Sequence, residues 1–169
     1  MKTFQFAFLL AFGLSSLNSF AQEYTQILVD DFHKYGIKRC DNFIMANSPL
    51  KGNWNYFMSK HAGGIDGKST EVSVIRIWGD GADTVKVSDS YIQTRAACYL
   101  HRRTTLTYKG ACEENIDLDI WTMSHPLAGR DYKVYTNKGG VDMFAKEVTV
   151  GEAKLCIQET EIRKKGRRD

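Results

Sequence analysis

The spacing of apolar residues along this chain changes from a helical period to the two-residue period of β-strands. Between residues 24 and 46, apolar side chains recur mostly at steps of three and four, with charged residues at intervening positions. Gly36 weakens the middle of this stretch, so the pattern allows two helical pieces. The helix is expected to end at Ser48, because a residue that precedes a proline avoids the helical conformation.

From residue 71 the apolar positions alternate almost to the end of the chain, which predicts strands joined by short turns. Residues 51–69 are rich in glycine and aromatic residues and are expected to form a loop. The predicted strands are 71–78, 84–92, 95–106, 116–120, 132–136, 141–150 and 153–162. Connections this short cannot cross over between parallel strands. The sequence therefore predicts an α+β fold, with an N-terminal helix packed on a curved, mostly antiparallel sheet of six or seven strands.

Residues 1–21 have the pattern of a secretory signal peptide. Lys2 is followed by a short apolar run, and Ser19 and Ala21 are the small residues that a signal peptidase recognises. We expect this leader to be removed, leaving a single domain over 22–161 and a basic, flexible tail over 162–169. No later run approaches about 20 apolar residues, so no stable membrane anchor is expected. The expected compartment is the bacterial periplasm, with secretion as the alternative.

Four cysteines follow the leader, at Cys40, Cys98, Cys112 and Cys156. An even number in an oxidising compartment indicates two disulfides. A tight turn at residues 109–110 would put the sulfurs of Cys98 and Cys112 about 30 Å apart, which is too far for a bond. Two pairings remain open: Cys40–Cys98 with Cys112–Cys156, or Cys40–Cys112 with Cys98–Cys156.

The positive charge of the chain is concentrated in its last eight residues. The formal net charge is +3, and loss of Lys2 with the leader lowers it to +2. Residues 162–169 contain five cations and one acid, so residues 22–161 carry a charge of −2. The tail is predicted to be solvated, with an anionic surface or acidic partner as the alternative. Nucleic acid is not an expected partner, because export separates the chain from it and no binding motif accompanies the tail.

The sequence contains no recognisable catalytic or metal-binding set. Its four histidines, His33, His61, His101 and His125, occur singly, without the spacing of metal ligands. No nucleophile elbow is present, and the cysteines are expected to be oxidised. We therefore predict no metal and no cofactor, and favour a protein that is not an enzyme. The alternative is a small exported hydrolase in which His61, His125 and an acid of the sheet meet in space.

Two segments have the chemistry of a binding surface. Residues 52–58 hold Trp54, Tyr56 and Phe57, side chains that either pack in the core or contact a partner. Residues 124–130 combine His125 and Arg130 with a stiff proline, and a stiff loop loses little entropy on binding.

The size, the expected export and the absence of a catalytic set favour a protein-binding domain. Its most concrete form is a periplasmic inhibitor or immunity protein that blocks a toxin or a cell-wall-degrading enzyme. A carrier or sensor that holds a small ligand between helix and sheet is a further alternative.

Overall fold

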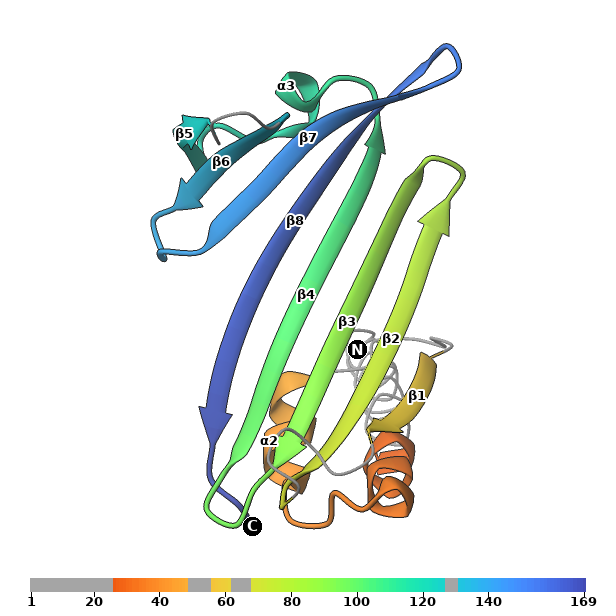
Figure 1. Cartoon of the computed structure of the whole chain (residues 1–169), viewed down its shortest axis with the longest axis vertical. Coiled ribbons are helices and arrows are strands. Elements are labelled where there is room, and N and C mark those ends of the chain that lie inside the picture. Colours follow the sequence, from red (N-terminus) through yellow and green to blue (C-terminus); the bar gives the residue numbers. More distant parts are fainter. Residues whose placement is uncertain (1–25, 49–55, 62–67, 127–130) are drawn as a thin grey trace, which may run out of the picture.

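Figure 1 shows a computed structural model of the chain, which describes residues 26–48, 56–61, 68–126 and 131–169. The described part begins with a helix over residues 26–35, followed by helix α2 (Asp41–Asn47). One sheet contains the strands, in the order β1-β2-β3-β4-β8-β7-β6-β5. The strands are β1 (Tyr56–His61), β2 (Thr70–Asp80), β3 (Asp83–Gln93), β4 (Cys98–Lys109), β5 (Trp121–Pro126), β6 (Tyr132–Asn137), β7 (Asp142–Val150) and β8 (Ala153–Gly166), and a short helix α3 (Cys112–Asn115) follows β4.

All neighbouring strands in this sheet are antiparallel, as the short connections predict. The sheet has eight strands, so the expectation of six or seven is corrected. β1 lies within the segment predicted as a loop, and β5 occupies residues for which no strand was predicted. In contrast, residues 116–120 form a turn instead of the predicted strand.

The turn at 116–120 has a local cause in Asp117. The Asp117 carboxylate accepts a hydrogen bond from the backbone N–H of Asp119 at 2.9 Å. The Asp117 carbonyl accepts one from the N–H of Trp121, also at 2.9 Å. Aspartate favours such turns because its side chain competes for backbone donors. An alternating apolar pattern therefore does not form a strand here.

The N-terminal helix ends just before Gly36, the position at which the sequence allowed two helical pieces. This residue has a φ of 101°, a left-handed conformation that glycine adopts without steric cost. The N–H of Ile37 reaches back to the carbonyl of Phe32 at 3.0 Å, which closes the helix end.

Two buried clusters lie on the same face of the sheet, at opposite ends of its long strands. The lower core joins the two N-terminal helices to β1–β4, and the upper core joins α3 to β6–β8 (Figure 1). Register explains the shared face, because residues two apart on a strand point the same way. We call this face the covered face and the opposite one the open face. The buried residues of the lower core are Leu28, Val29, Phe32, Ile37, Cys40, Ile44, Met58, Val72, Val74, Tyr91, Cys98 and Leu100; those of the upper core are Cys112, Ile116, Tyr135, Met143, Ala145 and Cys156.

Each core contains one disulfide. Cys40 is bonded to Cys98 with a Cα–Cα distance of 5.9 Å, and Cys112 to Cys156 with a distance of 4.7 Å. The prediction of two disulfides is confirmed, and the structure selects one of the two pairings that the sequence left open. Two disulfides fit an oxidising compartment, extracellular or periplasmic.

Residues 162–169 differ from the predicted flexible tail. Residues 162–166 are the last part of β8 and pair with β4. Beyond them, the Asp169 carboxylate accepts hydrogen bonds from the backbone N–H of Asn42 at 3.1 Å and from its side-chain amide at 2.7 Å. The basic end is therefore tied to the first turn of α2. None of the helices in the described ranges is long and apolar enough to cross a membrane.

Candidate functional site

The sequence-predicted binding residues lie on opposite edges of the sheet. Tyr56 and Phe57 belong to β1, the first strand in the spatial order, and His125 belongs to β5, the last. Trp54 and Arg130 lie outside the described residues. The described residues of the two predicted segments therefore do not form one surface.

The side chains of Tyr56 and Phe57 have different environments because they point to opposite faces of β1. The Tyr56 hydroxyl donates to the Asp31 carboxylate at 2.5 Å, and its ring packs against the lower core. Burial, and then this hydrogen bond, raises the pKa of Tyr56 above its usual value. Phe57 is 63% exposed and lies opposite Ile75 of β2. Tyr56 thus attaches β1 to the first helix, and Phe57 remains available on the open face.

Three of the exposed large apolar residues of the described part fall within six residues, in β5 and in the turn before it. Leu118, Ile120 and Met123 are 67%, 54% and 55% exposed. Residues 122–125 of the strand are all exposed, His125 included, so both faces of β5 are accessible to solvent in this segment. We call Leu118, Ile120, Met123 and His125 the β5 surface. Isolated exposed apolar residues are ordinary, but a contiguous group marks a candidate interaction site.

The sequence predicted only His125 of this surface. Leu118 and Ile120 were expected to point into the core, because they alternate with Asp117 and Asp119 as on a half-buried strand. The signal that could have revealed the turn is Asp117, because an aspartate side chain accepts a hydrogen bond from the backbone two residues further on.

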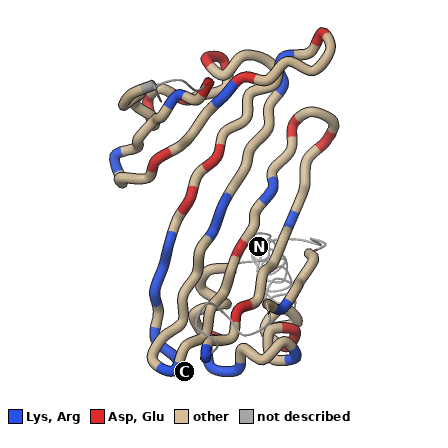
Figure 2. Tube along the Cα trace, in the orientation of Figure 1, with Lys and Arg blue, Asp and Glu red and all other residues tan. Residues whose placement is uncertain are grey.

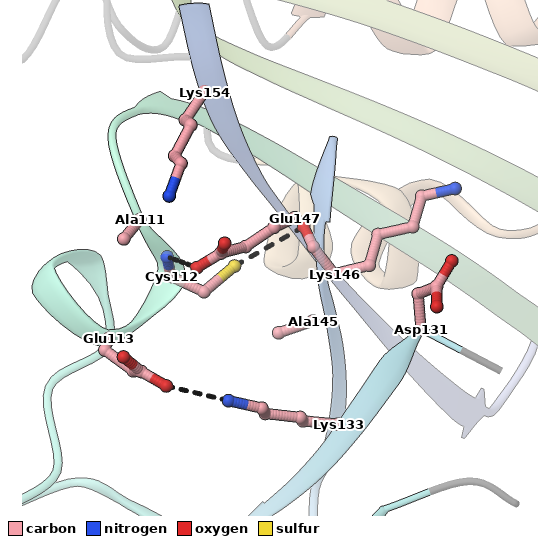
Figure 3. A pocket seen from close by; sticks show the side chains of 9 residues that line it. All are labelled: Ala111, Cys112, Glu113, Asp131, Lys133, Ala145, Lys146, Glu147 and Lys154. Atoms are coloured by element: carbon pink, nitrogen blue, oxygen red, sulfur yellow. Dashed lines mark hydrogen bonds and ion pairs between the residues drawn. The ribbon is translucent and has the colours of Figure 1, made fainter. Parts of the chain in front are cut away.

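A hollow of about 470 Å³ lies beside the upper disulfide (Figure 3). The Lys133 ammonium contacts the Glu113 carboxylate at 2.8 Å across one side of it, and this bond lowers the pKa of Glu113. Glu147 accepts a hydrogen bond from the N–H of Cys112 at 2.9 Å. Lys146, Lys154 and Asp131 complete the charged lining. With three lysines and three acids, the hollow does not select the sign of a ligand, but it can receive a polar side chain.

The histidines have separate partners. His33 contacts Asp41 at 2.8 Å, His101 contacts Glu161 at 3.2 Å, and His61 contacts the Ser73 hydroxyl at 2.7 Å. His61 and His125 lie on the two outermost strands, so the site imagined for a hydrolase is not formed by this pair. Among the described residues, no hydrogen bond joins His61 to a carboxylate that would orient it as a catalytic base. The described residues also contain no group of three or more potential metal ligands.

Comparison with known proteins adds no relative. No protein-family model matches the chain, and no curated protein or solved structure is significantly similar to it.

Proposed function

We propose that this protein is an exported, non-enzymatic protein-binding domain. Its concrete form is a periplasmic inhibitor or immunity protein, which blocks a toxin or a cell-wall-degrading enzyme by occupying it. The disulfides support a role outside the cytosol. The separation of His61 from His125 supports binding over the hydrolysis that this pair would perform.

The observation that carries the proposal is the exposure of the β5 surface. A strand normally buries one face, yet residues 122–125 bury neither, and Leu118 and Ile120 add apolar area beside them. Burying exposed apolar area contributes roughly 25 cal/mol per Å². A partner that covers these side chains would remove this exposed apolar area from water.

The partner is proposed to contact the side chains of β5 more than its backbone. A β-bulge lies between Met123 and His125, and the strand ends at Pro126. Bulges and prolines on edge strands hinder the addition of another strand. We therefore expect Leu118, Ile120 and Met123 to make apolar contacts with the partner, and His125 to make a polar contact.

The test compares carboxylates inserted on the β5 surface with one inserted away from it, in the mature chain, residues 22–169. The partner is first captured from envelope extract, then purified, and its affinity and enzymatic activity are measured with and without this protein. We expect L118D/I120D to weaken binding by about tenfold or more, because each change places a carboxylate in an apolar contact. I77D is the control, since Ile77 is 62% exposed but lies on β2, far from β5 in the strand order.

Loss of binding and of inhibition by L118D/I120D, with I77D unchanged, supports the proposal. Equal binding by both variants excludes the β5 surface, and a partner whose activity is unaffected by binding excludes the inhibitor role. Both substitutions are at exposed positions, so the unfolding midpoint of each variant is expected to stay close to that of the wild type.

A further inference from the structure

A second surface, independent of β5, lies along the lower half of β8. β7 pairs with β8 from Val150–Ala153 to Met143–Thr160 and then diverges. Residues 161–166 continue to pair with β4 on their other side. In the described part of the chain no strand covers their outer side, and Figure 1 shows this half of β8 as the border of the sheet. Its outward backbone N–H and C=O groups are therefore available for pairing.

Residues 163–165 of this open edge form a row of cations without carboxylate partners, whereas Glu161 is paired with Arg103 and His101 of β4. Arg163, Lys164 and Lys165 are all exposed, and none takes part in an ion pair among the described residues. Lys164 donates to the neutral side-chain oxygen of Asn47 at 2.9 Å, and the Lys165 ammonium lies over the Tyr99 ring, 5.8 Å from its centroid. Figure 2 shows Lys and Arg gathered at this end of the molecule.

Positive charge on an edge strand has a plain structural role. It prevents two copies of the chain from pairing edge to edge, because like charges would then face one another. The same arrangement is complementary to an extended segment of opposite charge. A cationic edge rejects its own copy and accepts an acidic strand, so one feature provides both the exclusion and the selectivity.

We propose that the edge of β8 at residues 161–166 binds an acidic, extended peptide segment of a partner protein by strand addition. Backbone hydrogen bonds would provide the pairing. Arg163 and Lys165, two residues apart on the open face, would meet acidic side chains at alternate positions of the added strand. Lys164 provides a cation on the covered face. The surface lies apart from β5, so this inference goes beyond the proposed function and can fail without it.

The experiment uses three synthetic peptides and the mature chain. The first peptide alternates Glu and Thr; the second has the same sequence with alternate backbone amides N-methylated; the third alternates Lys and Thr. Binding is followed by NMR titration, and hydrogen exchange reports on the amides of residues 161–166. We expect the first peptide to bind and to protect these amides, the second to bind about tenfold more weakly or not at all, and the third not to bind.

Charge reversal supplies the matched variants. R163E/K165E is expected to lose binding of the Glu peptide by about tenfold and to gain binding of the Lys peptide. K38E/R167E is the control, since both residues are exposed at the same end of the molecule but lie outside β8 and the total charge change is the same. The gain of Lys-peptide binding distinguishes a folded, charge-reversed edge from a variant that has merely unfolded.

Three results would overturn the inference. The first is equal binding of the methylated and unmethylated acidic peptides, which would indicate charge attraction without strand addition. The second is no binding of the Glu peptide to the wild-type chain. The third is an equal loss of Glu-peptide binding in R163E/K165E and K38E/R167E. None of them affects the β5 surface, whose test uses different residues and a different ligand.

Discussion

The two ends of the sheet are each closed by one disulfide, but they differ in how much apolar surface they bury. The lower core contains twelve buried residues, including Phe32, Tyr91 and Leu100, and two helices cover it. The upper core contains six, two of them cysteines, and its cover is the four-residue helix α3. Hydrophobic stabilisation scales with buried apolar area. The lower end therefore stabilises itself mainly by packing, and the upper end depends more on its covalent bond.

The difference bears on where the two proposed interaction surfaces lie. A small core leaves apolar side chains without cover. Leu118, Ile120 and Met123 are exposed, and in the sequence they closely follow Ile116, a buried residue of the upper core. The lower end buries more of its apolar residues, although Phe57 of β1 is exposed there, and the edge of β8 at this end is distinguished by its charge (Figure 2).

Removing each disulfide tests this difference most strongly. The bonds close sequence separations of 58 and 44 residues, so the chain-entropy model gives about 4 kcal/mol for either one. We expect C40A/C98A and C112A/C156A to lower the free energy of unfolding by similar amounts in urea titrations. Their hydrogen exchange should differ. C112A/C156A should expose the amides of α3, β5 and β6 while β2–β4 stay protected, because the lower core keeps its apolar contacts.

Uniform loss of protection across the sheet in C112A/C156A would contradict the comparison. It would mean that the long strands make the two ends one cooperative unit.

A buried polar network beside the lower core provides the next test. The Asp89 carboxylate accepts hydrogen bonds from Arg76 and from two nitrogens of Arg102, at 2.6 and 2.8 Å. Arg102 also donates to the carbonyl of Asn47 at 2.7 Å, which joins the strand to α2. We expect D89A to cost about 3 kcal/mol in the free energy of unfolding, because it leaves two guanidinium groups without their shared carboxylate.

The control for D89A is E161A on the open face. Glu161 pairs with Arg103, which is half exposed, so its loss is expected to cost under about 1 kcal/mol. Equal costs for the two acids would show that the network at Asp89 does not contribute to the stability of the lower end.

Much of the lower end could be predicted from the sequence. The helical period, the break at Gly36 and the strands over 71–78 and 84–92 follow from apolar spacing, because each of these elements buries one regular face. Arg76 and Asp89 are harder to recognise, since they interrupt buried positions. One feature does indicate that they are buried. Arg76 lies two positions from Val74, and Asp89 lies two positions from Tyr91, so each shares a face of its strand with a buried residue.

The upper end was predicted less well at β5 and at residues 116–120, where the apolar pattern and the burial disagree. β5 has exposed residues on both faces, so no apolar period marks it as a strand. Residues 116–120 have the period without the strand, because Asp117 forms a turn. The pairing of β4 with β8 joins segments far apart in the chain, and such contacts leave no local pattern. The choice between the two disulfide pairings depends on that arrangement.

A smaller effect is expected from G166A at the end of β8. A Cβ atom at residue 166 would overlap the ring of Phe43, which packs against the lower core. Moving that ring should cost about 1–3 kcal/mol, seen as a lower melting temperature. G139A, in the turn between β6 and β7, is the control, because its added carbon would meet only the Asn137 side chain, whose oxygen lies at 3.3 Å. Equal melting temperatures would show that the basic end of the chain is not packed on the lower core.

The smallest effect is expected from acid. At the lower end, hydrogen bonds from Lys34, at 2.6 Å, and then from Tyr56 lower the pKa of Asp31; at the upper end, Lys133 lowers that of Glu113. A lowered folded-state pKa stabilises the fold above the unfolded carboxyl pKa of about 4, and this contribution is lost as pH falls through the lower folded value. The urea midpoint of unfolding is expected to fall as the pH drops below about 4. Because Asp31 is more buried than Glu113, D31N should reduce this fall more than E113Q does. A steeper influence of E113Q would place the acid-sensitive contact at the upper end and reverse the comparison.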